Sequence, residues 1–142
     1  SSAASDVYKR QAWVESHHDP YAVFVTTVPA TDAATEGGER IIGFSALSVF
    51  YDRAGYDGVT DLAYYIAPEW QGRGAGTFTL AKLLDECRNR HMRKACGIIF
   101  ADNRGSIALM KHFGFTQFGL MPQAATDSTG TMRDMSYWHL DL

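Results

Sequence analysis

Apolar and aromatic residues recur along this chain in short runs separated by polar turns, and each run predicts one element of secondary structure. Six runs rich in β-branched and aromatic residues are typical of strands: residues 21–28, 41–50, 60–67, 94–101, 115–122 and 131–142. Two other segments repeat apolar residues at spacings of three and four, which is typical of helices: residues 74–92 and the stretch between Asn103 and Gly114.

The boundaries of these elements carry their own signals. Asn103 is a residue type that caps helix N-termini, and Gly114 is the type that follows a helix C-terminus. Residues 12–18 read as the end of a helix that Asp19-Pro20 stops. Residues 29–40, which include Gly37-Gly38, read as a loop.

The order of the elements predicts the fold class. Antiparallel strands come first, followed by strand, helix, strand, helix and two closing strands. This order indicates an α+β (or α/β) fold whose sheet contains a parallel strand–helix–strand crossover in the middle. We expect a single domain over residues 12–142, because no segment reads as a linker.

The first eleven residues read differently from the rest. Residues 1–5 have the composition of a linker, and residues 6–11 (Asp-Val-Tyr-Lys-Arg-Gln) resemble the translated end of a transposon adaptor used in sequencing. We therefore expect residues 1–11 to be non-native or disordered. A native disordered tail is the alternative.

Composition narrows the class of protein. The net charge is −3 and 46% of residues are hydrophobic, which predicts a globular protein without a nucleic-acid partner or a membrane span. Cys87 and Cys96 fit two reduced core thiols in a cytoplasmic protein. The five histidines have no metal-ligand spacing, and we expect no metal. We expect His17 and His18 to be exposed, and His91 to lie in a helix.

The most informative stretch is the glycine-rich turn at residues 71–76 (Gln-Gly-Arg-Gly-Ala-Gly). It follows a predicted strand and precedes a predicted helix, so its backbone N–H groups would face an anion at a helix N-terminus. A P-loop would need Gly-Lys-Ser/Thr, whereas the turn continues with Thr77 and Phe78. A dinucleotide fingerprint would need a third glycine at position 79, where the chain has threonine.

A third phosphate motif fits. Gln-x-x-Gly-x-Gly between a strand and a long helix resembles the acyl-CoA pyrophosphate loop of the GNAT superfamily of N-acetyltransferases. Residues 103–109 (Asn-Arg-Gly-Ser-Ile-Ala-Leu), closing at Gly114-Phe115, resemble the second hallmark of that superfamily. The two motifs occur in the superfamily's order.

Two further segments narrow the resemblance. Residues 53–57 (Arg-Ala-Gly-Tyr-Asp) and 134–141 resemble the phosphinothricin acetyltransferase-like branch. The resemblance implies a mixed, mostly antiparallel, twisted sheet and an enzyme that uses acetyl-CoA. The acceptor would be the amine of an amino-acid-like small molecule, and several members act as dimers. The family's first strand and first helix have no counterpart here, so we expect a truncated gene.

The resemblance also implies which residues bind the cosubstrate. Backbone groups of the strand before the loop would bind the pantetheine arm, and the loop would bind the pyrophosphate. Arg73 would add charge or be solvated, and Asn103 would contact the cofactor, cap a helix, or do both. The implied cofactor-binding residues are Tyr64, Tyr65, Ile66, Gln71, Gly72, Arg73, Gly74, Ala75, Gly76, Thr77 and Asn103.

The catalytic residues depart from the family pattern. The branch has a glutamate at the head of the strand before the loop, and this chain has Asp61 there. Because aspartate is shorter by about 1.5 Å, we expect Asp61 to act as a base through a water; capping a turn is the alternative. Many members place a proton-donating tyrosine where this chain has Met110. A thiol leaves with little help, so activity remains expected.

The acceptor residues are also inferred from the resemblance. Arg53 would pair with a carboxylate and Tyr56 would line the acceptor site. The family's basic loop before the closing strand carries a histidine, whereas this chain has residues 127–131 (Asp-Ser-Thr-Gly-Thr), which weakens phosphinothricin itself as the substrate. Two other functions stay open: acetylation of a peptide N-terminus, and a CoA-binding module with little catalysis.

Overall fold

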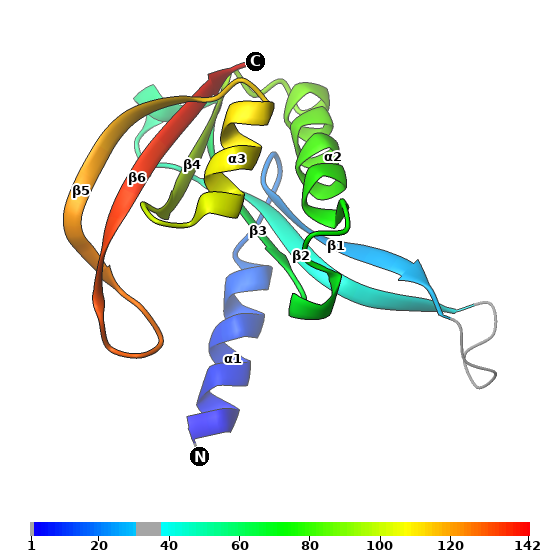
Figure 1. Cartoon of the computed structure of the whole chain (residues 1–142). Helices are drawn as coiled ribbons and strands as arrows, with labels where there is room; N and C mark the ends of the chain where they lie inside the picture. Colours follow the sequence, from blue (N-terminus) through cyan, green and yellow to red (C-terminus); the bar gives the residue numbers. More distant parts are fainter. Residues whose placement is uncertain (1, 31–37) are drawn as a thin grey trace.

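The computed structural model describes residues 2–30 and 38–142. Within these residues the chain folds into one six-stranded sheet with three α-helices and two short 3-10 helices (Figure 1). The elements in chain order are α1 (Ser2–Glu15), β1 (Ala22–Pro29), β2 (Glu39–Val49), η2 (Ala54–Tyr56), β3 (Val59–Ile66), η3 (Pro68–Trp70), α2 (Ala75–Asn89), β4 (Lys94–Phe100), α3 (Arg104–His112), β5 (Thr116–Thr126) and β6 (Met132–Asp141).

The sheet has the strand order β1-β2-β3-β4-β6-β5. Only the β3–β4 pair is parallel within the described sheet, and α2 connects these two strands as the crossover helix. The predicted fold class is therefore confirmed, and so is the position of the crossover at the centre of the chain. The six predicted strands all form. Alternation gives the inner strands a face to bury, whereas the edge strand β5 is mostly exposed and is held by its pairing with β6.

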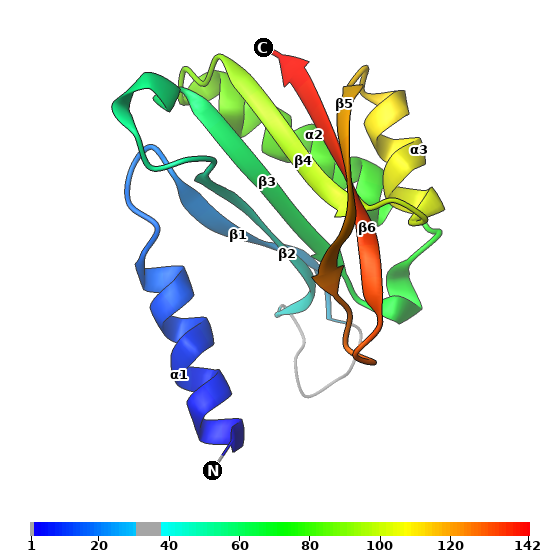
Figure 2. The ribbon, with the colours of Figure 1, turned by 90° about the vertical axis from the view of Figure 1, so that its left-hand side faces the viewer.

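Helices α2 and α3 cover one face of the sheet. Figure 2 views the sheet from the other side and shows α2 behind β3 and β4, with α3 next to β5 and β6. The buried face of α2 repeats at spacings of three and four, and four of its side chains are at most 2% exposed: Leu80, Leu83, Leu84 and Cys87. Burial of side chains of this kind stabilises the fold by about 1.5–3 kcal/mol each.

Helix α1 contacts the opposite face of the sheet. The indole of Trp13 packs edge-on against Phe44 of β2, with ring centroids 6.3 Å apart. Side chains alternate along a strand, so Phe44 points away from Leu47, which lies in the core beneath α2. The side chains of residues 9–16 are otherwise exposed, so this helix is held to the sheet by few contacts.

Some boundaries differ from the sequence expectation. Helix α1 begins at Ser2 and includes residues for which the sequence indicated no element, while the native or foreign origin of residues 1–11 stays a prediction. Helix α2 ends at Asn89 rather than near Met92. Strand β5 extends to Thr126, beyond residue 122, because its pairing with β6 resumes at Ala125 after a register irregularity that includes Pro122. Residues 31–37 of the predicted loop lie outside the described residues.

No helix in the described part of the chain is long and apolar enough to cross a bilayer.

Candidate active site

The glycine turn forms the start of α2. Gly74 is the N-cap residue of the helix and has φ +87°, and Gly72 has φ +72°. Both values lie in the left-handed region, where a side chain would be strained. A Cβ atom at either position would meet no other atom within 4 Å, so the space beside these two glycines is open to a ligand.

The turn is tied to the strand that precedes it. The Gln71 side-chain amide donates a hydrogen bond of 3.0 Å to the carbonyl oxygen of Ile66, the last residue of β3. Between them, Pro68 begins the 3-10 helix η3. The glutamine of the motif therefore closes the connection and fixes where the N–H groups of α2 begin relative to the strand.

The β3–β4 ladder ends part-way along both strands. Their parallel pairs run from Val59 and Lys94 to Leu62 and Gly97 and then stop, although β3 continues to Ile66 and β4 to Phe100. Beyond this point the backbone of β3 from Ala63 onward has no partner strand on the β4 side. Unpaired strand groups need other partners, and a ligand lying along this edge would supply them.

Met110 of α3 packs at the point where the ladder ends. Its sulfur lies 2.9 Å from where a Cβ atom at position 97 would be, and the side chain is fully buried. The glycine at position 97 thus makes room for the methionine. Position 110 serves packing here, since a thioether has no proton to donate.

A cavity of about 490 Å³ joins the glycine turn, the free edge of β3 and the first turn of α3. Its volume is in the range of small-molecule sites. Twelve residues line it: Tyr64, Tyr65, Ile66, Gln71, Gly72, Gly74, Gly76, Thr77, Asn103, Gly105, Ser106 and Leu109.

Asp61 lies on the sheet face opposite α2 and α3. In the register it faces Ser48 of β2 and Cys96 of β4, one pair before the ladder ends. Its Oδ1 atom is buried and has no hydrogen-bond partner. Burial disfavours the charged form and raises the pKa of this carboxyl from 3.8 to about 6. A carboxylate with this pKa is ionised at neutral pH and is a stronger base than an exposed aspartate.

A profile of one known protein family matches most of this chain. The Acetyltransferase (GNAT) family profile matches residues 3–115. The chain belongs to the GNAT acetyltransferase family. This confirms the resemblance indicated by the glycine turn and by the segment that begins at Asn103.

Curated and solved relatives of this GNAT chain agree with the family match. It is 27% identical over 138 residues to the L-methionine sulfoximine/L-methionine sulfone acetyltransferase of Pseudomonas aeruginosa, covering 96% of this chain and 75% of that one. A Sinorhizobium meliloti phosphinothricin acetyltransferase, solved in complex with acetyl-CoA, matches with a TM-score of 0.74 and 25% identity, covering 97% of this chain and 69% of that one.

A third relative is named for a different acceptor. The ribosomal-protein-alanine N-acetyltransferase of Brucella melitensis matches with a TM-score of 0.79 and 26% identity, covering 95% of this chain and 78% of that one. Among curated relatives, the chain spans 66% of the length of a Bacillus subtilis protein and 62% of a Streptomyces coelicolor phosphinothricin N-acetyltransferase.

The cavity of this GNAT domain brings together most residues expected to bind the cofactor. Nine line it, while Arg73 and Ala75 do not. The Arg73 guanidinium instead lies over the Trp70 ring, 4.7 Å from its centroid, which is a cation–π contact. Gly105, Ser106 and Leu109 also line the cavity. They belong to the second hallmark, so its helical spacing after Asn103 could have identified them.

Asn103 acts as a helix cap. Its side-chain oxygen accepts a hydrogen bond of 3.1 Å from the backbone N–H of Ser106 and so satisfies one free donor of α3. The same side chain lines the cavity. Its amide NH₂ group has no role in the cap, so it is available to a ligand.

Two residues expected to bind the acceptor lie elsewhere. Arg53 and Tyr56 are exposed, next to the N-terminal end of β3, and neither lines the cavity. The Tyr56 ring packs against Tyr51, with centroids 5.2 Å apart, and the Arg53 guanidinium lies 5.6 Å from the centroid of Tyr51. Along the chain, Asp61 comes after Tyr51 and Tyr56 and before the residues of β3 that line the cavity.

His17 is a neighbour of Asp61 that the sequence did not reveal. We expected it to be exposed, but it is half-buried, and its Nε2 atom lies 2.8 Å from the Ser48 hydroxyl. Ser48 is paired with Asp61 across the sheet. The contact spans thirty-one positions along the chain, so no local pattern could have signalled it. His18, next to it, is exposed as expected.

The cysteines are placed as core thiols. Cys87 and Cys96 are both free and buried. Burial raises the pKa of Cys87 to about 12, and burial with the nearby Asp61 carboxylate also raises the pKa of Cys96. Both thiols are therefore poor nucleophiles. Within residues 2–30 and 38–142, no group of three or more His, Cys, Asp or Glu side chains is arranged to hold a metal ion.

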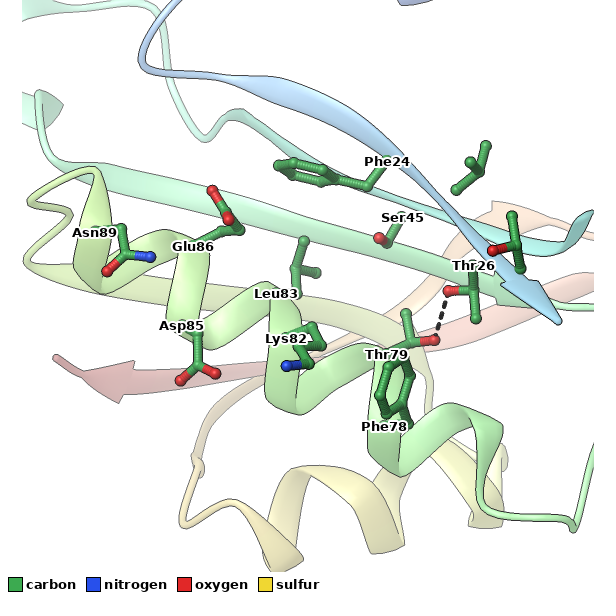
Figure 3. A pocket seen from close by; sticks show the side chains of 12 residues that line it. Phe24, Thr26, Ser45, Phe78, Thr79, Lys82, Leu83, Asp85, Glu86 and Asn89 are labelled. Atoms are coloured by element: carbon green, nitrogen blue, oxygen red, sulfur yellow. Dashed lines mark hydrogen bonds between the residues drawn. The ribbon is translucent and has the colours of Figure 1, made fainter. Parts of the chain in front are cut away.

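A second cavity of about 490 Å³ lies between the edge strand β1 and α2 (Figure 3). Thr26 of β1 and Thr79 of α2 share a hydrogen bond of 2.8 Å across it. Its other lining residues include the exposed Phe78 and Val25. No glycine and no helix N-terminus belongs to this lining, so we place the chemistry at the glycine turn.

Proposed function

We propose that this chain is an N-acetyltransferase that transfers the acetyl group of acetyl-CoA to the amine of a small amino-acid-like acceptor. One observation carries the proposal. The β3–β4 ladder ends beside a cavity that begins at the glycine-rich N-terminus of α2, where backbone N–H groups suit an anion. This arrangement suits a ligand with a phosphate at one end and an extended amide-containing arm.

The residues present fit acetyl-CoA. The N–H groups of the turn at residues 72–77 would hold the pyrophosphate, assisted by the dipole of α2. The free edge of β3 at residues 63–66 would bind the pantetheine amides as a neighbouring strand would. The carbonyl of Ile66 already accepts from Gln71. Backbone groups alternate in direction along a strand, and Ala67 donates to Ile42 of β2, so Tyr65 faces β2 and the available groups are those of Tyr64 and the Ile66 N–H. When bound, acetyl-CoA supplies the acetyl thioester.

Asp61 would remove the proton from the acceptor amine. A primary amine is mostly charged at neutral pH, and acetylation needs its lone pair. The Asp61 carboxylate is ionised above about pH 6, and its free Oδ1 atom can accept the proton. We keep the proposal that a water bridges Asp61 and the amine, because the aspartate side chain is short.

The acceptor class is supported by relatives and by one cluster of residues. The Pseudomonas aeruginosa relative is named for methionine sulfoximine and methionine sulfone, which are amino-acid derivatives. Arg53 and Tyr56 remain our proposed acceptor-binding residues, since an arginine fork suits an α-carboxylate. Replacing Arg53 with alanine should raise KM for an amino acid and leave KM for acetyl-CoA unchanged.

The test is a thiol-release assay with acetyl-CoA and a panel of amines. The panel contains proteinogenic L-amino acids, methionine sulfoximine, phosphinothricin and a short peptide with a free N-terminus. We expect an amino acid or amino-acid analogue to accelerate CoA release, and Asp61→Ala to abolish most of that acceleration. Release no faster than the amine-free blank with every amine, or full activity in Asp61→Ala, contradicts the respective assignment.

Two alternatives are decided by the same measurements. A peptide acceptor is favoured by the Brucella melitensis relative and by the exposure of residues 51–57, which line neither cavity; preferential turnover of the peptide would establish it. A CoA-binding module with little catalysis is favoured by Met110. It predicts that acetyl-CoA raises the melting temperature while no amine releases CoA.

Location and assembly follow from the proposed chemistry. We propose a cytoplasmic enzyme, because the cosubstrate and two free thiols suit a reducing compartment. A homodimer stays a prediction, which the mass of the protein in solution measured by light scattering would test.

A further inference from the structure

Tyr64 presents a buried hydroxyl in the wall of the cosubstrate cavity. The residue alternates with Asp61, Ala63 and Tyr65, so its side chain points to the α2–α3 face of the sheet. There it packs against the core cluster that contains Met110. It is the second residue of β3 after the ladder with β4 ends at Leu62.

The oxygen of this hydroxyl has no hydrogen-bond partner and is screened from water. The Ser106 hydroxyl lies near enough to lower the pKa of Tyr64, but the two groups do not form a hydrogen bond of normal geometry, and burial has the larger, opposite effect. A buried hydroxyl without a partner is costly. A ligand group that enters beside it would supply the missing partner.

We propose that the Tyr64 hydroxyl donates its proton to the CoA sulfur during acetyl transfer, which would make it a catalytic residue. This rests on the proposed function. The tyrosine expected at position 110 is a methionine, and that methionine packs against Gly97 at the end of the ladder. Tyr64 reaches the same region from the strand instead of from the helix, since both residues belong to one packed cluster.

The amine nitrogen forms a bond to the thioester carbonyl carbon, and the carbon–sulfur bond breaks with its electron pair moving to sulfur. The Tyr64 Oη–H proton goes to the sulfur, which leaves as CoA thiol. The charged amine first loses one proton to Asp61, which passes it to solvent, and the neutral amine then attacks. The second proton, lost by the nitrogen as the amide forms, also goes to Asp61 on the opposite face, and solvent exchange then returns a proton to the tyrosinate and removes one from Asp61.

Proton removal from the amine and proton donation to the sulfur thus take place on opposite faces of the sheet. Asp61 and Tyr64 lie on opposite faces of β3, on either side of the point where its pairing with β4 ends. The raised pKa of Tyr64 keeps it protonated at neutral pH, as a donor must be. The raised pKa of Asp61 makes it a better base.

The first experiment measures the ionisation of the thiol of bound CoA, with no amine present. CoA is bound to the wild-type chain, to Tyr64→Phe and to Tyr137→Phe, and the ultraviolet absorbance of the thiolate is followed as pH is raised. Tyr137 is a matched control: a tyrosine of β6 whose hydroxyl contacts Met121 and which does not line the cavity. A hydrogen bond from Tyr64 stabilises the thiolate, so bound CoA should ionise about one pH unit lower in the wild type and in Tyr137→Phe than in Tyr64→Phe.

The second experiment measures turnover on an accepted amine. We expect Tyr64→Phe to lower kcat about tenfold or more, with little change in KM for acetyl-CoA, and Tyr137→Phe to match the wild type. Identical thiol ionisation in wild type and Tyr64→Phe overturns the inference, as does a change in KM alone. If no amine is turned over while the ionisation difference is present, the acetyl-transfer function fails and the contact between Tyr64 and the sulfur stands.

Discussion

The Nε2 atom of His17 lies 2.8 Å from the Ser48 hydroxyl oxygen, and the Nδ1 atom of the same ring lies 2.7 Å from the backbone carbonyl of Trp13. A carbonyl oxygen only accepts, so Nδ1 carries a proton, and in the neutral ring Nε2 then accepts from the serine. One imidazole therefore joins the end of α1 to the strand that is paired with the Asp61 strand.

Replacing His17 with alanine should loosen α1. The side chains of residues 9–16 are otherwise exposed, so the helix loses its main polar contact with the sheet. We expect a loss of about 1–2 kcal/mol in the free energy of unfolding, measured by urea denaturation. His18→Ala is the control, because His18 is exposed and makes no side-chain hydrogen bond within the described residues. Equal losses in both variants would contradict this anchoring role.

Asp61→Asn should lower kcat and, above about pH 6, should raise the free energy of unfolding relative to the wild type. The folded pKa of Asp61 lies above its ordinary value, from 3.8 to about 6, so the folded state binds this proton more tightly than the unfolded state. The stabilising contribution is complete below pH 3.8 and is lost as pH rises through about 6. The wild type therefore loses about 3 kcal/mol over this window relative to the asparagine variant, which has no such titration.

The measurement for Asp61 combines denaturation and kinetics. Urea unfolding of the wild type and Asp61→Asn is compared below pH 4 and above pH 6, and kcat is followed over the same range. We expect the wild-type rate to rise with pH through about 6 and the rate of the variant to be low throughout. A stability difference that does not change with pH would mean that the carboxyl is not perturbed by burial.

Gly74→Ala should weaken acetyl-CoA binding more than a glycine replacement elsewhere. The new Cβ has open space around it, so the cost comes from the left-handed backbone at φ +87°, about 1–2 kcal/mol. It also narrows the approach of a phosphate to the helix N-terminus. Gly55→Ala is the control, since its Cβ also has open space. The readout is the rise in melting temperature on adding acetyl-CoA, which should shrink only in Gly74→Ala.

Arg133 joins the closing hairpin to the segment that leads into α3. Its guanidinium donates to the carboxylate of Asp102, which precedes Asn103, and to Asp127 at 3.0 Å. Thr129 and Thr131 also donate to Asp127, and these bonds hold its pKa below the usual range.

Arg133→Met should therefore reduce acetyl-CoA affinity several-fold by freeing Asp102 and the segment that follows it. Arg133→Lys should recover part of the loss, because a lysine keeps the charge without the fork. Arg88→Met serves as the control, since Arg88 forms only an exposed pair with Asp85 on the far side of α2. Equal affinity in all three variants, measured by calorimetry, would show that the hairpin does not influence the cofactor site.

Gly97→Ala should be destabilising through a contact with Met110. The added Cβ would lie 2.9 Å from the methionine sulfur, so the buried side chain has to move. Overpacking of this kind costs about 1–3 kcal/mol. In the double variant with Met110→Ala the clash is absent, so the two losses should sum to more than the measured loss of the double variant. Strict additivity in urea denaturation would place the cost elsewhere.

The sequence predicted the fold and the turn because their signals are local. Alternation along a strand and helical spacing are visible within a few residues, and Gly72 and Gly74 are needed where the backbone is left-handed. The C-terminal ends of α2 and α3 show where local signals are no longer sufficient. Both α2 and α3 end in the same backbone motif, with Gly114 at the left-handed position after α3 and His91, at φ +59°, after α2. A glycine marks such an end, and a histidine does not.

What the sequence could not reveal depends on distant contacts. The residues around Asn103 were sufficient to predict that it caps α3. The burial of the Asp61 and Tyr64 oxygens without hydrogen-bond partners depends instead on which strands end beside them. The same holds for Arg133, whose partner Asp102 is thirty-one positions away. Arg53 and Tyr56, identified by family resemblance alone, lie outside the cavity, because the resemblance indicates order along the chain and not position in space.

The early end of the β3–β4 ladder has a kinetic consequence. An opening between two strands can be reached from both faces of the sheet, so a donor lying along β3 and an acceptor arriving at the Asp61 face do not compete for one entrance. Both substrates can then be bound at once, and the acetyl group can pass directly to the amine without a covalent acetyl-enzyme intermediate. Initial-rate plots against either substrate should therefore intersect rather than run parallel.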